Sequence, residues 1–347
     1  MVGKWMEGFE THMAEEQLAR KYATQSGTVA QRAGRVHGNA GGPNSLVLVT
    51  PSLGLSSTVI MGFGMRLATQ QTTLNSGAQG FYFERGASEQ CHIEIQSNAG
   101  SFELKLMRGS TQIGITTETF AYGAWHHFEV SVTTDPSSGA YEIRHNEVNV
   151  LSDTGVNLAD SGSAQSDVWA MRFSSNVGAQ LYLDDFYLID TTGSTNNTFR
   201  GDTLVEGILP NANGATNAWT QNGSGDNYTS VDDPATSAPD DSGTGGTCGS
   251  DTNGQKDLYA YEDLTQIQGN IHFIQVGTQL GMAATGSRTV KSKYRDPDTT
   301  EADGDTHTVD STQFDEFTEI MDENPAASAA WDVADINNGQ FGVEVVS

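Results

Sequence analysis

Apolar residues recur at every second position along residues 126–133, and polar residues fill the positions between them. The apolar members are Phe128, Val130 and Val132, and the polar members are His127, Glu129, Ser131 and Thr133. A period of two is typical of a half-buried strand. Turn-forming residues follow at 135–139, and the alternation resumes at Tyr141. The pattern predicts a β-hairpin over residues 123–152, opened by Trp125.

Short alternating runs of the same kind fill residues 1–190, with one short stretch of helical composition at 14–23. The other expected strands are 4–13, 45–53, 59–67, 80–84, 91–95, 101–107, 112–117, 168–174 and 181–190. Many short strands with turn signals close together indicate an all-β sandwich and not alternating strands and helices.

The second half of the chain begins with polar sequence and regains regularity later. Residues 191–255 are rich in Thr, Asn, Gly, Ser and Asp, and we expect a polar connector and extended arm there. Alternating runs return over 256–347, together with a predicted helical segment at 323–340. The sequence therefore predicts a β-sandwich at 1–190, the connector at 191–255, and a smaller β-rich sandwich domain at 256–347.

The hairpin sequence resembles the laminin-G or concanavalin-like jelly roll. The matching residues are Trp125, His126 and His127 at the start of the first strand. A short polar turn, Arg144 to Glu147, matches near the end of the second strand. The resemblance implies a concanavalin/laminin-G-like jelly-roll sandwich. It implies little about function, because one fold carries many functions.

The charge is strongly negative and unevenly distributed. The net charge is −27, and residues 1–190 carry 11 basic and 19 acidic side chains, whereas residues 191–347 carry 6 and 25. Phosphate binding needs clustered Lys and Arg, so we expect no nucleic-acid partner. The same negative field opposes binding to anionic membranes, and it is compatible with cation binding.

The two cysteines and the first residues indicate whether to expect a disulfide, a signal peptide or a membrane segment. Cys91 shares a strand face with Ile93 and Ile95 and is expected to be a buried thiol, while Cys248 lies in a loop sequence. They fall in different halves, so a disulfide is not indicated. The first residues contain no apolar signal core, and no stretch approaches 18 apolar residues. We therefore expect no classical signal peptide and no membrane insertion.

Catalytic signatures are missing from the sequence. It contains no G-x-S-x-G elbow, H-E-x-x-H, P-loop or G-x-G-x-x-G motif. No strand places two carboxylates on one face, as acid/base cleavage of a sugar requires. His126 and His127 point to opposite faces of a strand and cannot bind one metal together, so we expect one to be packed and one exposed. The chain is predicted to have no catalytic residues and not to be an enzyme.

Adjacent aspartates in an apolar strand are the most unusual feature. Asp184 and Asp185 are costly to bury unless they are paired or bound to a cation. The resemblance to jelly-roll carbohydrate-binding modules implies that Glu10 and this aspartate pair hold a structural Ca²⁺. The alternative is that the aspartates meet solvent at a sheet edge or pair with an arginine such as Arg172.

The whole chain also resembles structural proteins of tailed phages. The features that carry the likeness include the segments at 8–10, 18–22, 121–130, 139–152, 182–194, 202–214 and 323–344. The resemblance implies a non-enzymatic virion component of the tail, a fibre or spike, or the head surface. Its expected partners are other virion proteins, further copies in a homo-oligomer, and a host-surface glycan. The alternative is a stand-alone carbohydrate-binding lectin-like module.

Overall fold

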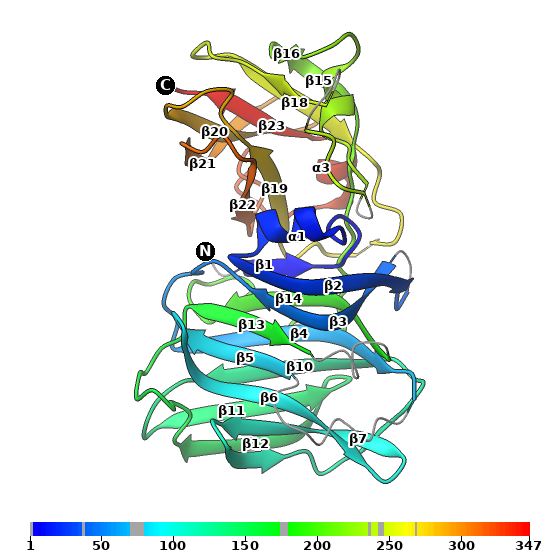
Figure 1. Ribbon diagram of the computed structural model, residues 1–347, viewed down its shortest axis with the longest axis vertical. Helices are drawn as coiled ribbons and strands as arrows, with labels where there is room; N and C mark the ends of the chain where they lie inside the picture. Colours follow the sequence, from blue (N-terminus) through cyan, green and yellow to red (C-terminus); the bar gives the residue numbers. More distant parts are fainter. Residues whose placement is uncertain are drawn as a thin grey trace. The chain divides into compact units, whose positions relative to one another are not determined.

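The fold of the chain is almost entirely β-structure (Figure 1). The computed structural model describes residues 3–36, 39–69, 80–173, 180–234, 237–241, 246–267 and 269–347. Strands make up 52% of the structure and helices 5%, so the predicted all-β class is confirmed. The helix expected at 14–23 is α1 (Glu15–Lys21). Within the described ranges, no helix is both long and apolar enough to cross a bilayer.

The chain forms two compact units, whose boundaries differ from those expected. The sandwich unit comprises Val2–Phe9 and Tyr22–Val205, and the C-terminal unit comprises Glu10–Lys21 and Glu206–Ser347. The N-terminal helix thus belongs to the C-terminal unit, although the sequence pattern assigned it to the first domain. The later boundary falls at residue 205 and not at 190.

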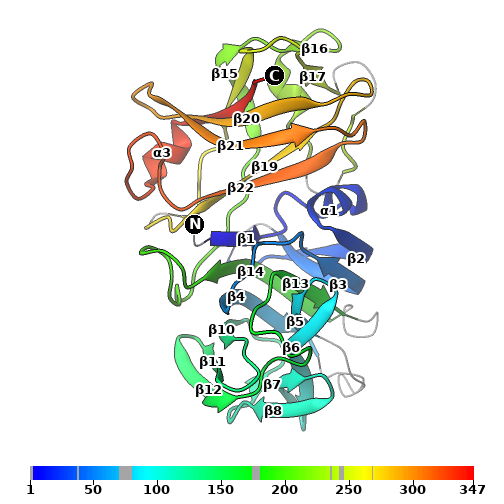
Figure 2. The same ribbon diagram turned by 90° about the vertical axis from the view of Figure 1, so that its left-hand side faces the viewer.

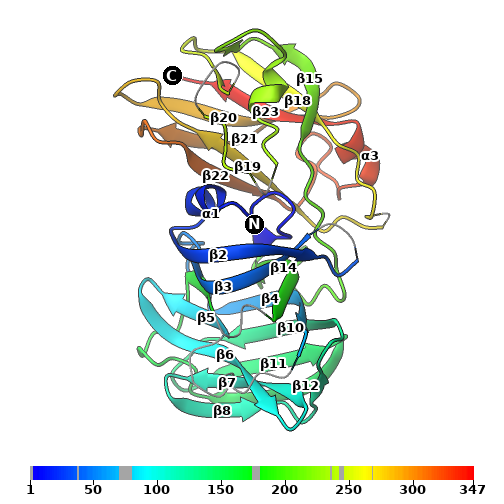
Figure 3. The same cartoon turned by 45° about the vertical axis from the view of Figure 1, so that its right-hand side comes forward.

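The sandwich unit is one antiparallel sheet of 14 strands, which Figure 3 follows from β2 and β3 through β4 and β10 to β11 and β12. The main strand order is β12-β11-β10-β4-β14-β3-β13-β5-β6-β7-β8, with β1, β2 and β9 paired beside this path. The strands are β1 (Gly3–Glu7), β2 (Thr24–Ala33), β3 (Asn39–Val49), β4 (Thr58–Leu67), β5 (Gly80–Arg85), β6 (Ser88–Asn98), β7 (Ser101–Arg108), β8 (Thr111–Ile115), β9 (Phe120–Ala121), β10 (His126–Thr133), β11 (Gly139–His145), β12 (Val148–Val156), β13 (Val168–Arg172) and β14 (Leu181–Asp190).

The two ends of this sheet meet, so that its apolar face is enclosed. Gly114 of β8 leaves room for Tyr141 of β11, whose hydroxyl lies 2.5 Å from where a Cβ would stand. The Thr117 amide donates to the Val150 carbonyl at 3.3 Å. The enclosed side chains are the apolar set of the alternating runs, among them Phe63, Phe81, Phe102, Phe128 and Trp169, all at most 2% exposed. Burial of these rings is the main stabilising contribution to the unit.

The predicted hairpin forms from β10 and β11. Val130 pairs with Ile143, and Val132 with Tyr141. The next turn, between β11 and β12, has positive φ at both Asn146 and Glu147, 45° and 69°, as a tight two-residue hairpin turn requires. One expectation for this hairpin was wrong. His126 and His127 are both buried, at 7% and 2% exposure, although one was expected to be exposed.

The C-terminal unit packs a five-stranded sheet, of order β15-β18-β23-β20-β21, against the pair β19–β22 (Figure 2). Tyr294, Trp331 and Phe341 lie at the centre of its core. The remaining elements are β15 (Pro210–Asn217), β16 (Thr220–Gln221), η2 (Asn227–Ser230), β17 (Cys248–Gly249), β18 (Lys256–Tyr261), β19 (Ile274–Leu280), β20 (Arg288–Arg295), β21 (Glu301–Val309), β22 (Asp315–Met321), α3 (Val333–Asn337) and β23 (Gln340–Val345). The helix expected at 323–340 is thus limited to α3.

The region expected to be an extended arm is partly built into the C-terminal unit. β15 pairs with β18, and a fully buried carboxylate holds the residues that follow. Asp257 accepts hydrogen bonds from the Trp219 amide at 2.7 Å, the Asn227 side chain at 2.6 Å and the Tyr259 hydroxyl at 3.0 Å. These bonds order a polar segment without a large apolar surface. Residues 235–236 and 242–245 of this region lie outside the described part.

Candidate functional site

The site lies on the outer face of β10, β4 and β14, which points away from the enclosed core. Strand pairing places its residues in successive rows. Tyr182 lies opposite Arg66, and Asp184 lies opposite Gly64, which also faces His127. Gly62 lies opposite both Glu129 and Tyr187. The polar side of the predicted hairpin therefore meets the predicted aspartate pair across β4.

Two glycines in β4 make room for long side chains to cross this face. A Cβ on Gly62 would stand 2.0 Å from Cε1 of Tyr187, and a Cβ on Gly64 would stand 2.9 Å from Cδ of Arg35. Real Cβ atoms do not approach other atoms this closely, so any side chain at either position would displace the tyrosine or the arginine. The glycines therefore determine how the face is covered.

Arg35 donates hydrogen bonds to both members of the aspartate pair. Its amide donates to Asp184 at 2.7 Å, and its Nε donates to Asp185 at 2.7 Å. Its two terminal nitrogens donate to Asp202 at 2.5 Å and to the Thr203 carbonyl at 2.8 Å. The paired alternative to calcium is therefore observed, but with Arg35. Arg172, the arginine expected in that role, instead pairs with Glu84 at 2.6 Å.

The electrostatics of the aspartate pair follow from its burial. Both carboxylates are 2% exposed, and Asp185 sits at a β-bulge with a φ of 51°. Burial, together with the neighbouring Asp185 carboxylate, raises the pKa of Asp184 to about 8. Arg35 opposes this shift. Burial lowers the pKa of Arg35 itself, but the charges of Asp185 and Asp202 outweigh burial and raise that pKa above its usual value.

A segment that we call the strap, residues 199–205, covers part of the outer face. Glu129 accepts hydrogen bonds through Oε1 from the Tyr187 hydroxyl at 2.6 Å, the Arg200 amide at 2.7 Å and the Gly201 amide at 2.9 Å. The Val205 amide donates to Asp185 at 2.8 Å. One buried glutamate and one buried aspartate thus fix the strap at both ends.

His127 is buried within this polar cluster without a hydrogen bond from its ring to any described residue. Burial, together with the charges of Arg35 and His145, lowers its pKa to about 4, although Asp202 opposes the shift. The imidazole is therefore neutral at pH 7. His127 and Glu129 were expected on the exposed side of the hairpin, and their burial corrects that expectation.

The predicted calcium ligands belong to different units. Glu10 belongs to the C-terminal unit, whereas Asp184 and Asp185 belong to the sandwich unit. In the described part of the chain, no group of three or more His, Cys, Asp or Glu residues is placed to hold a metal ion. The aspartate oxygens already accept hydrogen bonds from Arg35 and Val205. Calcium binding by Glu10 and this pair stays a prediction.

The end of the outer face near Tyr182 remains partly exposed, and it carries aromatic and cationic side chains. We call this set the aromatic–arginine patch: Trp125, Tyr182, Arg66 and Arg32. The rings of Trp125 and Tyr182 are nearly perpendicular, at 85°, with centroids 6.1 Å apart. The guanidinium carbons of Arg66 and Arg32 lie 5.0 and 5.6 Å from the centroid of the Tyr182 ring. These are cation–π distances.

Sequence reasoning missed this patch. Two signals were present: Arg66 is the one charged residue in an otherwise apolar strand, and Tyr182 shares a strand face with Asp184. Trp125 was interpreted only as the start of the hairpin. Arg32 carried no local signal, because its approach to Tyr182 depends on the pairing of β2 with β3.

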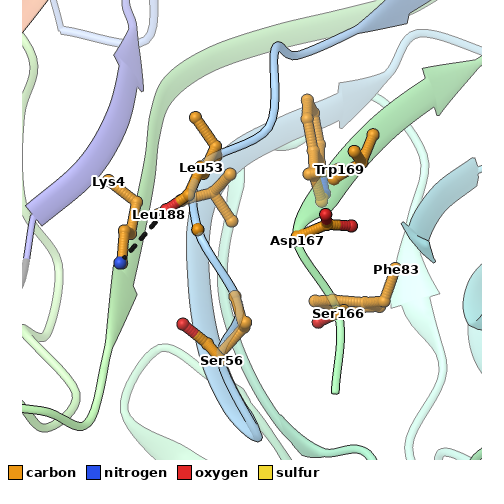
Figure 4. Close-up of a pocket in the computed structure, with 11 residues that line it drawn as sticks. Lys4, Leu53, Ser56, Phe83, Ser166, Asp167, Trp169 and Leu188 are labelled. Atoms are coloured by element: carbon orange, nitrogen blue, oxygen red, sulfur yellow. Dashed lines mark hydrogen bonds between the residues drawn. The ribbon is translucent and has the colours of Figure 1, made fainter. Parts of the chain in front are cut away.

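Two other features of the sandwich unit are less suited to binding. On the outer face of β5, Tyr82 is only 4% exposed, and its ring is covered by His92, at 4.6 Å, and by Arg172, at 4.4 Å. The hollow in Figure 4 has an empty volume of about 310 Å³, which includes open solvent. Its walls include the buried rings of Trp169 and Phe83, and its one cation, Lys4, already pairs with Asp190 at 3.0 Å.

Comparisons with known proteins find structural similarity over about half of the chain. No protein-family model and no curated protein matches. A carbohydrate-binding module from Bacillus subtilis is 10% identical, with a TM-score of 0.34 over 52% of this chain and 98% of that one. A carbohydrate recognition domain is 9% identical, with a TM-score of 0.37 over 54% and 97%. An alginate lyase is 11% identical, with a TM-score of 0.36 over 55% and 98%. At these values the likeness assigns no function.

Proposed function

We propose that this chain is a non-enzymatic carbohydrate-binding protein and that the aromatic–arginine patch contacts the saccharide. The observation that carries the proposal is the pair Trp125 and Tyr182, which are partly exposed at the uncovered end of the outer face. Saccharide rings pack their C–H faces on aromatic rings, and guanidinium groups donate hydrogen bonds to sugar oxygens. The patch supplies both kinds of contact.

The buried part of the outer face supports the patch. Asp184 and Tyr182 are two residues apart on β14, so the Arg35 pairing fixes the strand that carries the tyrosine. The two cation–π contacts restrict the Tyr182 ring. A contact surface held in place before binding loses less conformational entropy when the ligand arrives.

Binding without catalysis fits the chemistry of the patch. Its four side chains include no carboxylate, thiol or imidazole to act as a general acid, base or nucleophile. Glu129 and His127, which have suitable groups, lie beneath the strap. The absence of enzymatic activity stays a prediction.

A glycan array probed with the intact chain tests the proposal. We expect binding to a defined set of saccharides, and Trp125→Ala should weaken it at least tenfold, or about 1.4 kcal/mol. Trp219→Ala is the matched control, because Trp219 is also partly exposed but lies in the C-terminal unit. Binding to no saccharide, or equal loss in both variants with the fold intact by circular dichroism, would contradict the proposal.

A further inference from the structure

We infer that the saccharide bound by the aromatic–arginine patch is anionic, carrying carboxylate or sulfate groups. The inference rests on the proposed function and names the class of ligand. It comes from the charges of Arg32 and Arg66. In the described part of the chain, neither guanidinium forms an ion pair or a hydrogen bond, and the Nε atom of each is buried.

Arg66 and Arg32 lack an ion pair although acidic residues outnumber basic ones by 44 to 17 in this protein. The nearby Arg35, by contrast, is paired with both Asp185 and Asp202. Arg66 and Arg32 have only the π-face of Tyr182 as a partner, which supplies no countercharge. The patch thus holds two positive charges that no described side chain neutralises.

Guanidinium chemistry indicates which ligand groups would complete the patch. Arginine stays charged at all ordinary pH values, and its planar fork matches the oxygens of a carboxylate or sulfate. A neutral sugar would accept hydrogen bonds but would leave both charges uncompensated. A uronate or sulfated sugar would satisfy the donors and the charges while its ring packs on Trp125.

The net charge of −27 raises an objection, because it repels polyanions at long range. Screening decides between the two effects. At an ionic strength of 0.1 M the Debye length is about 10 Å, so distant carboxylates contribute little while contact with the two arginines persists. We therefore expect binding to be measurable near physiological salt.

The test compares saccharides that differ only in charge, at an ionic strength of 0.1 M. Suitable pairs are oligogalacturonate with its methyl ester, and chondroitin sulfate with chemically desulfated and esterified chondroitin. We expect the anionic member of at least one pair to bind at least tenfold more tightly. Arg66→Gln and Arg32→Gln should each reduce that binding at least fivefold, whereas Arg85→Gln, an exposed arginine of the same unit, should leave it unchanged.

The outcomes separate the inference from the proposed function. If neutral saccharides bind as tightly as anionic ones and Trp125→Ala weakens both, the proposed function stands and the inference is wrong. If no saccharide of either kind binds, the proposed function itself fails. If Arg66→Gln and Arg85→Gln reduce anionic binding equally, the attraction is non-specific, and the inference is again wrong.

Discussion

Replacing Arg35 by methionine should strongly destabilise the sandwich unit. The side chain of Arg35 is 9% exposed and that of Asp185 is 3% exposed, so their contact at 2.7 Å is shielded from water. The second partner, Asp202, is 48% exposed and contributes less than about 1 kcal/mol. Removing one member of a buried pair leaves an uncompensated charge, which costs about 3–5 kcal/mol. The expected loss is therefore about 3–5 kcal/mol, almost all of it from Asp185.

Urea unfolding followed by hydrogen exchange in peptides from β10 and β14 would measure this loss in the sandwich unit alone. Arg85→Met is the control, and its effect should stay within about 0.5 kcal/mol, because Arg85 is exposed. Adding Asp185→Asn to Arg35→Met should recover part of the loss, since asparagine removes the charge and tolerates the φ of 51°. A loss below about 1 kcal/mol for Arg35→Met would refute the buried-pair reasoning.

Three further substitutions test neighbouring parts of the structure. Burial lowers the pKa of His127 to about 4, so the native protein resists protonation of this imidazole and its stability falls as the pH drops from about 6.5 to 4. In urea unfolding, His127→Leu should reduce that fall by about 3 kcal/mol. Gly62→Ala should cost at least about 2 kcal/mol, because the added Cβ displaces Tyr187, and an unchanged urea midpoint would contradict this. In the C-terminal unit, burial raises the pKa of Glu316, but the contact with His12 at 2.7 Å helps to hold that pKa below its usual value. Acidification followed by circular dichroism should show that His12→Gln loses stability at a higher pH than the unsubstituted protein.

Local sequence patterns predicted much of the fold. The period of two identified the strands around Phe128 and the hairpin that they form, because one buried face fixes the register. The aspartate pair was correctly identified as costly to bury and in need of a partner. Its partner was not predictable, because Arg35 is about 150 residues away in sequence and reaches the pair only through tertiary packing.

Sequence periodicity does not show that the strap covers part of the outer face. Alternation placed His127 and Glu129 on the non-core side of the strand, which is correct, and the expectation of exposure followed from that. The strap buries these side chains, because two backbone amides from residues 200 and 201 donate hydrogen bonds to Glu129. Backbone donors are the same for every sequence, so the residues of the strap gave no signal of this contact.

Several expectations remain predictions. They include the role as a tailed-phage virion protein, self-association into a homo-oligomer, contacts with other virion proteins, and calcium binding by Glu10, Asp184 and Asp185. A host-surface glycan is the expected partner that the aromatic–arginine patch fits best. The patch makes that partner testable on the isolated chain.

Hydroxyl-radical footprinting with a saccharide identified on the glycan array tests the central claim most directly. It reports the solvent accessibility of individual side chains, and aromatic residues react readily. The account predicts that the bound saccharide protects Trp125 and Tyr182, while Trp219 in the C-terminal unit reacts as it does in the free protein. Protection of Trp219 with unchanged reactivity at Trp125 and Tyr182 would show that the saccharide binds elsewhere and would contradict the account.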